Sequence, residues 1–130
     1  EFSELCDTQA GRPALAALAT TVQARLGEWR ELSSEVIAAS QRDVEEIGAV
    51  SVDFLQYSAY VLLAGFWLQA AARAQDALDA CSGEAAFYQA KLQSADFYLR
   101  RVLPRASAHR EALLGGAACL MAMDEASFTF

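Results

Sequence analysis

The sequence has few of the residues that bind metals or act as nucleophiles. It contains one histidine, His109, and three widely spaced cysteines, Cys6, Cys81 and Cys119. Zinc knuckles and dithiol redox sites need closely spaced thiols, and di-iron bundles need Glu-x-x-His pairs on facing helices. Neither pattern occurs, so we expect free thiols and no metal site.

Motifs of nucleophilic and nucleotide chemistry are also missing. There is no G-x-S-x-G elbow and no glycine-rich phosphate loop, because Gly115-Gly116 is too short and is followed by apolar residues. Haem ligation by His109 with Met121 or Met123 is disfavoured, since a lone helical histidine is more often a surface or capping residue. The sequence therefore assigns no catalytic, cofactor-binding or metal-binding residue.

Basic residues are outnumbered by acidic ones, 10 to 17, which gives a formal net charge of −7. Nucleic acids and anionic membranes attract basic surfaces, so we expect neither as a partner. The N-terminus lacks the pattern of a signal peptide, and we expect a cytoplasmic location. An uncharged run over residues 54–72 is long enough to span a bilayer, but its glutamines and alanines favour a buried core helix.

Only two prolines and seven glycines interrupt a chain rich in alanine and leucine, which favours helices. We expect an irregular segment over residues 1–12 and a single helical domain over residues 13–130. Apolar residues at three- and four-residue spacing predict a helix from Pro13 to about residue 40, either unbroken or as two halves joined near Gly27. They then predict a central helix over 44–79 that is apolar nearly all round, with Asp43 as its cap.

After a turn at Ser82-Gly83, a further helix is predicted to run to Pro104, which removes an amide donor and crowds the preceding turn. A shorter helix follows over about 105–114. The fold class expected is all-α, an antiparallel bundle of three to four long helices with the last kinked or broken near Pro104. The aromatic residues of this last helix, Phe87, Tyr88, Phe97 and Tyr98, are expected to pack in the core.

The basic residues gather in one part of the chain. Arg101, Arg105 and His109 follow one another at intervals of four, so they share a face if the helix continues past Pro104. We interpret this face as a candidate contact for an anion or a neighbouring domain. The alternative is a solvated face that pairs with acidic residues of the first long helix, such as Glu28.

Three segments carry a resemblance to a known family. They are SVDFLQYSAYVLLAGFWLQAAA at 51–72, FYQAKLQSADFYLRRVLP at 87–104 and GAACLMAMDEASF at 116–128. Together they resemble the additional C-terminal helical domain of some bacterial acyl-CoA dehydrogenases. The second and third segments are fairly specific, and the resemblance covers roughly residues 15–128.

The resemblance implies that the chain is a fragment of a larger flavoenzyme. Such enzymes bind FAD and oxidise an acyl-CoA to the trans-2-enoyl-CoA, while a glutamate removes the α-proton. The flavin domains and that glutamate lie upstream of this domain, so we expect no FAD bound to the chain itself. Implied partners are the upstream flavin domains, an electron-transfer flavoprotein and further copies in a homo-oligomer.

A different class of function stays open. The chain is then a freestanding helical adaptor or dimerisation module without enzymatic activity, with Trp29 and Phe128 exposed at an interface. A small metal or haem bundle is a third reading, which the scarcity of ligands disfavours.

Overall fold

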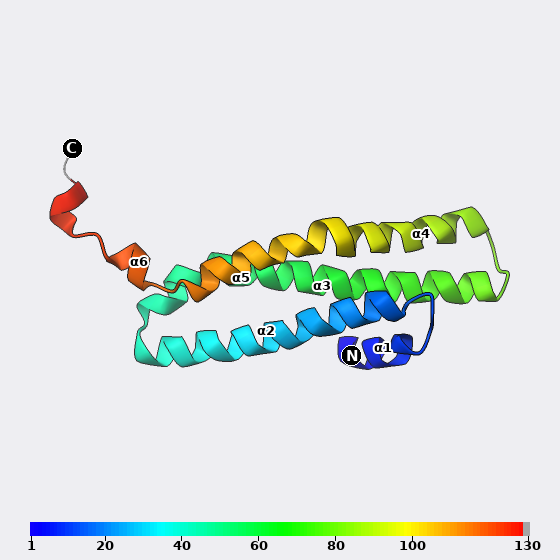
Figure 1. Ribbon diagram of the computed structural model, residues 1–130, viewed down its shortest axis with the longest axis horizontal. Helices are drawn as coiled ribbons and strands as arrows, with labels where there is room; N and C mark the ends of the chain where they lie inside the picture. Colours follow the sequence, from blue (N-terminus) through cyan, green and yellow to red (C-terminus); the bar gives the residue numbers. More distant parts are fainter. Residues whose placement is uncertain (129–130) are drawn as a thin grey trace.

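Three long helical rods run antiparallel in the computed structural model, which describes residues 1–128 (Figure 1). The described residues contain no strand. The elements are α1 (Phe2–Ala10), α2 (Ala16–Arg42), α3 (Glu45–Asp79), α4 (Ala85–Phe97), the π-helical η1 (Tyr98–Val102), the 3₁₀-helical η2 (Leu103–Arg105), α5 (Ala106–Leu114), α6 (Ala118–Met121) and the 3₁₀-helical η3 (Glu125–Phe128). The prediction of an all-α antiparallel bundle is confirmed. The proposed domain runs to residue 130, and its last two residues lie outside the described part.

Asp43 was predicted to cap α3, but the N-cap residue of α3 is Val44, one position later. Asp43 ends α2, and its Oδ1 accepts the backbone N–H of Glu45 at 3.0 Å, where α3 begins. The turn between α3 and α4 contains Cys81 and Gly83 with φ of 51° and 76°. Such positive φ values suit a tight reversal, in which glycine pays no steric penalty.

The third rod changes its hydrogen bonding before Pro104. Residues of η1 form a π-helical turn, and the N–H of Leu103 donates to the carbonyl of Tyr98, five residues back. Proline has no N–H and its ring crowds the preceding turn, so the regular α pattern stops here. Figure 1 shows that α4 and α5 nevertheless follow one another along a single rod. The predicted interruption near Pro104 is therefore a local change of winding.

The N-terminal segment differs from the sequence expectation, because α1 occupies most of residues 1–12. Cys6 and Gln9 of α1 are buried against the bundle. At Gly65 of α3, an added Cβ would lie 2.8 Å from the Phe2 ring, so only glycine allows this close approach. An irregular segment was predicted because the segment is short and is followed by Gly11-Arg12-Pro13, which interrupts a helix. Its contacts with α2 and α3, rather than its own propensity, favour the helix.

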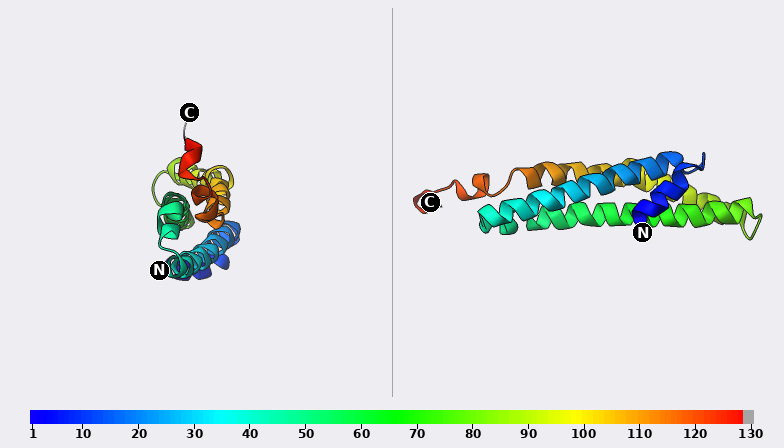
Figure 2. Two further views of the ribbon diagram at one scale, coloured as in Figure 1. Left: turned by 90° about the vertical axis from the view of Figure 1, so that its left-hand side faces the viewer. Right: turned by 90° about the horizontal axis from the view of Figure 1, so that it is seen from below.

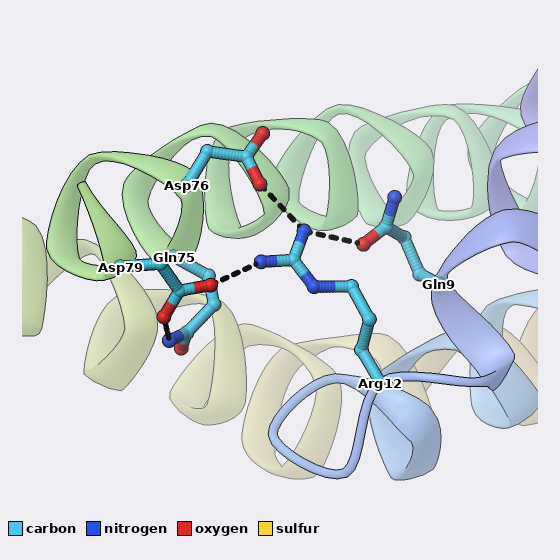
Figure 3. A network of polar contacts seen from close by, with 5 residues as sticks. All are labelled: Gln9, Arg12, Gln75, Asp76 and Asp79. Carbon is cyan, nitrogen blue, oxygen red and sulfur yellow. Dashed lines mark hydrogen bonds and ion pairs between the residues drawn. The ribbon is translucent and has the colours of Figure 1, made fainter.

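A polar network fastens the loop after α1 to the far end of α3 (Figure 3). The Arg12 guanidinium donates to Asp76 at 2.6 Å and to Asp79 at 2.9 Å, and also to Gln9 Oε1 at 3.1 Å. The two carboxylates stand in the last turns of α3, where the helix dipole disfavours negative charge and no basic residue is present. Arg12 supplies the missing positive charge at this helix end.

The centre of the bundle is α3, as predicted. Its buried side chains meet those of α2, α4 and α5, and Tyr57, Val61, Ala64 and Leu68 are completely buried. In the end-on view, however, the three rods occupy the corners of a triangle, so α3 has one open side (Figure 2). The expectation of a helix buried all round is wrong on that side, because a three-rod bundle cannot enclose any of its members.

Of the described residues, only α3 has the length and composition of a membrane span. A core helix of a soluble protein can meet the same criteria, and α3 packs against α1, α2, α4 and α5 while its outer side is exposed.

Candidate functional site

The predicted basic face lies on the third rod. Arg101 and Arg105 are both exposed. Within residues 1–128 neither guanidinium forms an ion pair or a hydrogen bond. The neighbouring Arg100 is different, because its Nε donates to Asp96 Oδ1 at 2.7 Å, four residues earlier. Two unpaired cations therefore remain available to a partner.

His109, the third predicted member, is held against α3. Its Nδ1 lies 2.8 Å from Asp53 Oδ1, and its ring stacks on Tyr60 with 5.8 Å between ring centroids. The imidazole and the Asp53 carboxylate are each about 30% exposed. The structure thus assigns His109 a contact between α5 and α3, whereas Arg101 and Arg105 face solvent.

A second polar cluster joins α2, α3 and α5. Glu28 Oε2 accepts hydrogen bonds from Arg25 at 2.7 Å and from Tyr57 at 2.8 Å. Arg25 also donates to Ser107 Oγ of α5 at 3.3 Å. Arg25 belongs to α2 like Glu28, so Tyr57 is the donor that crosses the helix interface. A carboxylate bonded in this way is a structural group, since it fixes the rotamers of its neighbours.

The electrostatics of this cluster oppose a catalytic role. Burial by itself would raise the pKa of Glu28, but hydrogen bonds from Tyr57 and Arg25 and the charges of Arg25 and Arg110 lower it below the ordinary value. Burial, together with the adjacent Glu28 carboxylate, raises the pKa of Tyr57 to about 12. A general base works best with a pKa near the ambient pH. Glu28 is a weaker base than an ordinary carboxylate, so it does not suit proton abstraction.

The charge of Arg110 on Glu28 gives partial support to the alternative interpretation of the basic residues. Arg110, a further basic residue of α5 next to His109, contributes to the lowered pKa of Glu28 on the first long helix. The two residues that carry the hypothesis of an external contact, Arg101 and Arg105, do not take part in that pairing.

A groove of about 920 Å³ lies beside Arg101, between the start of α2 and the third rod. Its walls are Ala14, Ala17, Leu18, Leu92, Gln93, Asp96, Phe97, Arg100 and Arg101. A dinucleotide cofactor presents two phosphates, which proteins usually bind with a helix N-terminus and a glycine-rich turn. This groove offers one unpaired guanidinium and no such turn, so its residues do not fit FAD. Within residues 1–128 no cluster of His, Cys, Asp and Glu could hold a metal ion.

Two sequence expectations about aromatic residues need correction. Tyr98 is buried, but Phe87 and Phe97 are exposed. Phe87 lies in the first turn of α4, and Phe97 lies on the outward side of its last turn, between the buried Ala95 and Tyr98. Trp29, expected at an adaptor interface, packs against the core and donates from Nε1 to Ser58 Oγ at 2.8 Å. Phe128 is exposed as expected.

Sequence reasoning did not find Asp53 as the partner of His109. A signal was present, since Asp53 is the only charged residue between Glu46 and Arg73. A single carboxylate in a long apolar helix predicts a buried or half-buried partner. His109, the only histidine of the chain, was therefore a candidate partner for the Asp53 carboxylate.

Comparison with known families gives one match. The family model described as "Acetyl-CoA dehydrogenase C-terminal like" matches residues 1–124. No curated protein and no solved structure gives a significant match.

Proposed function

The chain belongs to the acetyl-CoA dehydrogenase C-terminal-like family, whose model matches nearly its whole length, and on that premise we propose how it serves such an enzyme. It is the accessory C-terminal helical domain of an FAD-dependent acyl-CoA dehydrogenase. The parent enzyme oxidises an acyl-CoA to the trans-2-enoyl-CoA in the cytoplasm and passes electrons to an electron-transfer flavoprotein. Flavin domains and the catalytic base lie upstream of this chain. FAD, when bound there, accepts the hydride from the β-carbon.

The observation that carries this proposal is the match over residues 1–124. The polar side chains of the bundle interior support it. Glu28, Tyr57 and Asp53 are occupied with contacts between helices, so they are not presented to a substrate. The domain therefore contributes to assembly or covers the acyl-CoA site, and the reacting groups come from other domains.

Within this function, Arg101 and Arg105 contact an anionic group. Two exposed, unpaired guanidinium groups four residues apart on the third rod of an acidic chain suit a phosphate of coenzyme A or an acidic neighbouring domain. The test is the longer enzyme with Arg101→Ala and Arg105→Ala together. We expect weaker acyl-CoA binding or loss of assembly, measured by KM and by light scattering. Unchanged values for both would remove the contact role.

A matched control carries the same change of charge elsewhere. Arg30→Ala with Arg42→Ala alters two exposed arginines of α2, of which Arg30 donates to the Ser3 hydroxyl of α1, and we expect it to leave both measurements unchanged. An equal loss in the control would mean that overall charge, and not this face, is responsible.

The accessory role itself is tested on the purified 130-residue chain. After incubation with FAD and gel filtration, we expect the flavin absorbance to elute apart from the protein, and we expect no oxidation of acyl-CoA. Flavin that stays with the chain would contradict the proposal. A coding sequence that starts close upstream of residue 1 would favour the freestanding adaptor.

A further inference from the structure

The open side of α3 carries a largely apolar surface, in which Gln56 is the one exposed polar residue between Val52 and Phe66. Its members are uncharged, succeed one another at helical spacing and are each more than a third exposed. We call this surface the outer stripe, and it consists of Val52, Leu55, Ala59, Leu62, Leu63 and Phe66. Val52 and Leu55 are 66% and 65% exposed, and Phe66 is 55% exposed. Single exposed apolar residues are ordinary, but a contiguous stripe of this length is typical of an interaction surface.

Four residues of the outer stripe are placed symmetrically about Ala59, whereas Leu62 has the exposed Gln56 at its mirror position. Leu55 and Leu63 lie four positions before and after it, and Val52 and Phe66 lie seven positions before and after it. An antiparallel copy of α3 that crosses at Ala59 therefore places Leu55 against the partner's Leu63 and Val52 against the partner's Phe66. A two-fold dimer requires this kind of self-complementary surface.

Charged residues continue the same symmetry at both ends of the stripe. Glu45 and Arg73 lie fourteen positions before and after Ala59. Both are exposed, and neither forms an ion pair within residues 1–128. In the antiparallel arrangement Glu45 lies opposite the partner's Arg73, whereas a parallel arrangement would bring like charges together. On a straight α-helix, residues seven positions apart are offset by about 20° around the helix axis. A supercoil of the two paired helices removes this offset.

A small residue at the crossing point allows the two copies of α3 to approach closely. Alanine at residue 59 lets two helix axes approach to the short end of the usual range of about 8–10 Å. The neighbouring α1 does not close this side, because Phe66 stays half exposed even though its ring meets Phe2 edge-on at 5.2 Å.

We infer that the outer stripe is a homodimer interface, in which two copies of α3 pair antiparallel across a two-fold axis at Ala59. The inference goes beyond the proposed function, because it needs neither a flavin nor an upstream domain. Its outcome is thus independent of the FAD experiment on the same chain.

The first test is a disulfide at the axis. The exposed Cys81 and Cys119 are first replaced by serine, while the buried Cys6 remains. Ala59→Cys then places two thiols face to face, within reach of the usual Cα separation of about 5.5–6 Å. We expect this variant to oxidise to a covalent dimer under mild conditions. The control Ala38→Cys, on the exposed surface of α2, is expected to stay largely monomeric.

The second test reverses the charges. Glu45→Arg alone and Arg73→Glu alone are each expected to weaken dimerisation several-fold in sedimentation equilibrium, and the double variant is expected to recover most of it. The two positions lie too far apart on one helix to contact each other, since α3 rises about 1.5 Å per residue. Recovery therefore reports on pairing between copies.

Three outcomes would overturn the inference. They are a monomer at every concentration tested, equal cross-linking at positions 59 and 38, and a charge-reversed double variant no better than the single variants. Binding of the monomeric chain to neutral phosphatidylcholine vesicles, abolished by Leu55→Asp, would likewise overturn it and assign the stripe to lipid.

Discussion

The inward and outward faces of α3 are both apolar, yet they do different things. The inward face contains Tyr57, Val61, Ala64 and Leu68, all fully buried against the other rods. The outer stripe exposes side chains of the same hydrophobic types to solvent. A sequence pattern reports the chemistry of a side chain, but only the number and placement of neighbouring helices decide whether that side chain is covered.

Polarity separates the two faces more clearly than hydrophobicity does. Tyr57 and Ser58 point inward, and each makes a hydrogen bond with α2, to Glu28 and Trp29 respectively. The outer stripe has no such polar anchor. Directional hydrogen bonds fix a register within one chain, whereas a smooth apolar surface suits a partner that is added afterwards.

The largest expected difference between the faces is in stability. Leu68→Ala removes a fully buried side chain, and we expect it to lower the free energy of unfolding by about 2–5 kcal/mol, because it leaves a cavity. Leu63→Ala, on the outer stripe, is expected to change it by less than about 0.5 kcal/mol in dilute protein. Urea denaturation at low protein concentration measures both. Equal losses would show that the two faces are covered alike.

A smaller effect is expected from the polar anchor of the inward face. Tyr57→Phe deletes the donor to Glu28, and we expect a loss of about 1–2 kcal/mol, since Glu28 keeps its bond from Arg25. Tyr60→Phe is the control, because the Tyr60 hydroxyl has no hydrogen bond within residues 1–128. A control loss as large as that of Tyr57→Phe would assign the effect to ring packing instead of the Tyr57–Glu28 hydrogen bond.

Much of the fold was predictable because it depends on local signals. Asp43 marked a helix boundary, and Pro104 marked a change of winding, since each acts through its own backbone. The helix α1 and the exposure of Phe97 were not predictable, because they depend on which distant surface each segment meets. The same distinction applies to the candidate site. Spacing identified Arg101 and Arg105. The contact of His109 with Asp53 could not be predicted in this way, because it depends on how α5 packs on α3.

The smallest effect concerns the pH dependence that Glu28 gives to the inward face. Its pKa is lowered in the folded protein, so its contribution to stability is present above the ordinary carboxyl pKa and is lost as pH falls through the folded value. Glu28→Gln should therefore be less stable than the wild type at neutral pH and should lose less stability on acidification. The exposed Glu31→Gln, on the same helix, should keep the wild-type slope. Thermal unfolding from neutral pH to below pH 4 gives both slopes. Parallel curves for wild type and Glu28→Gln would mean that the Tyr57 and Arg25 contacts do not favour the charged carboxylate, and the inward face would then be held by packing alone.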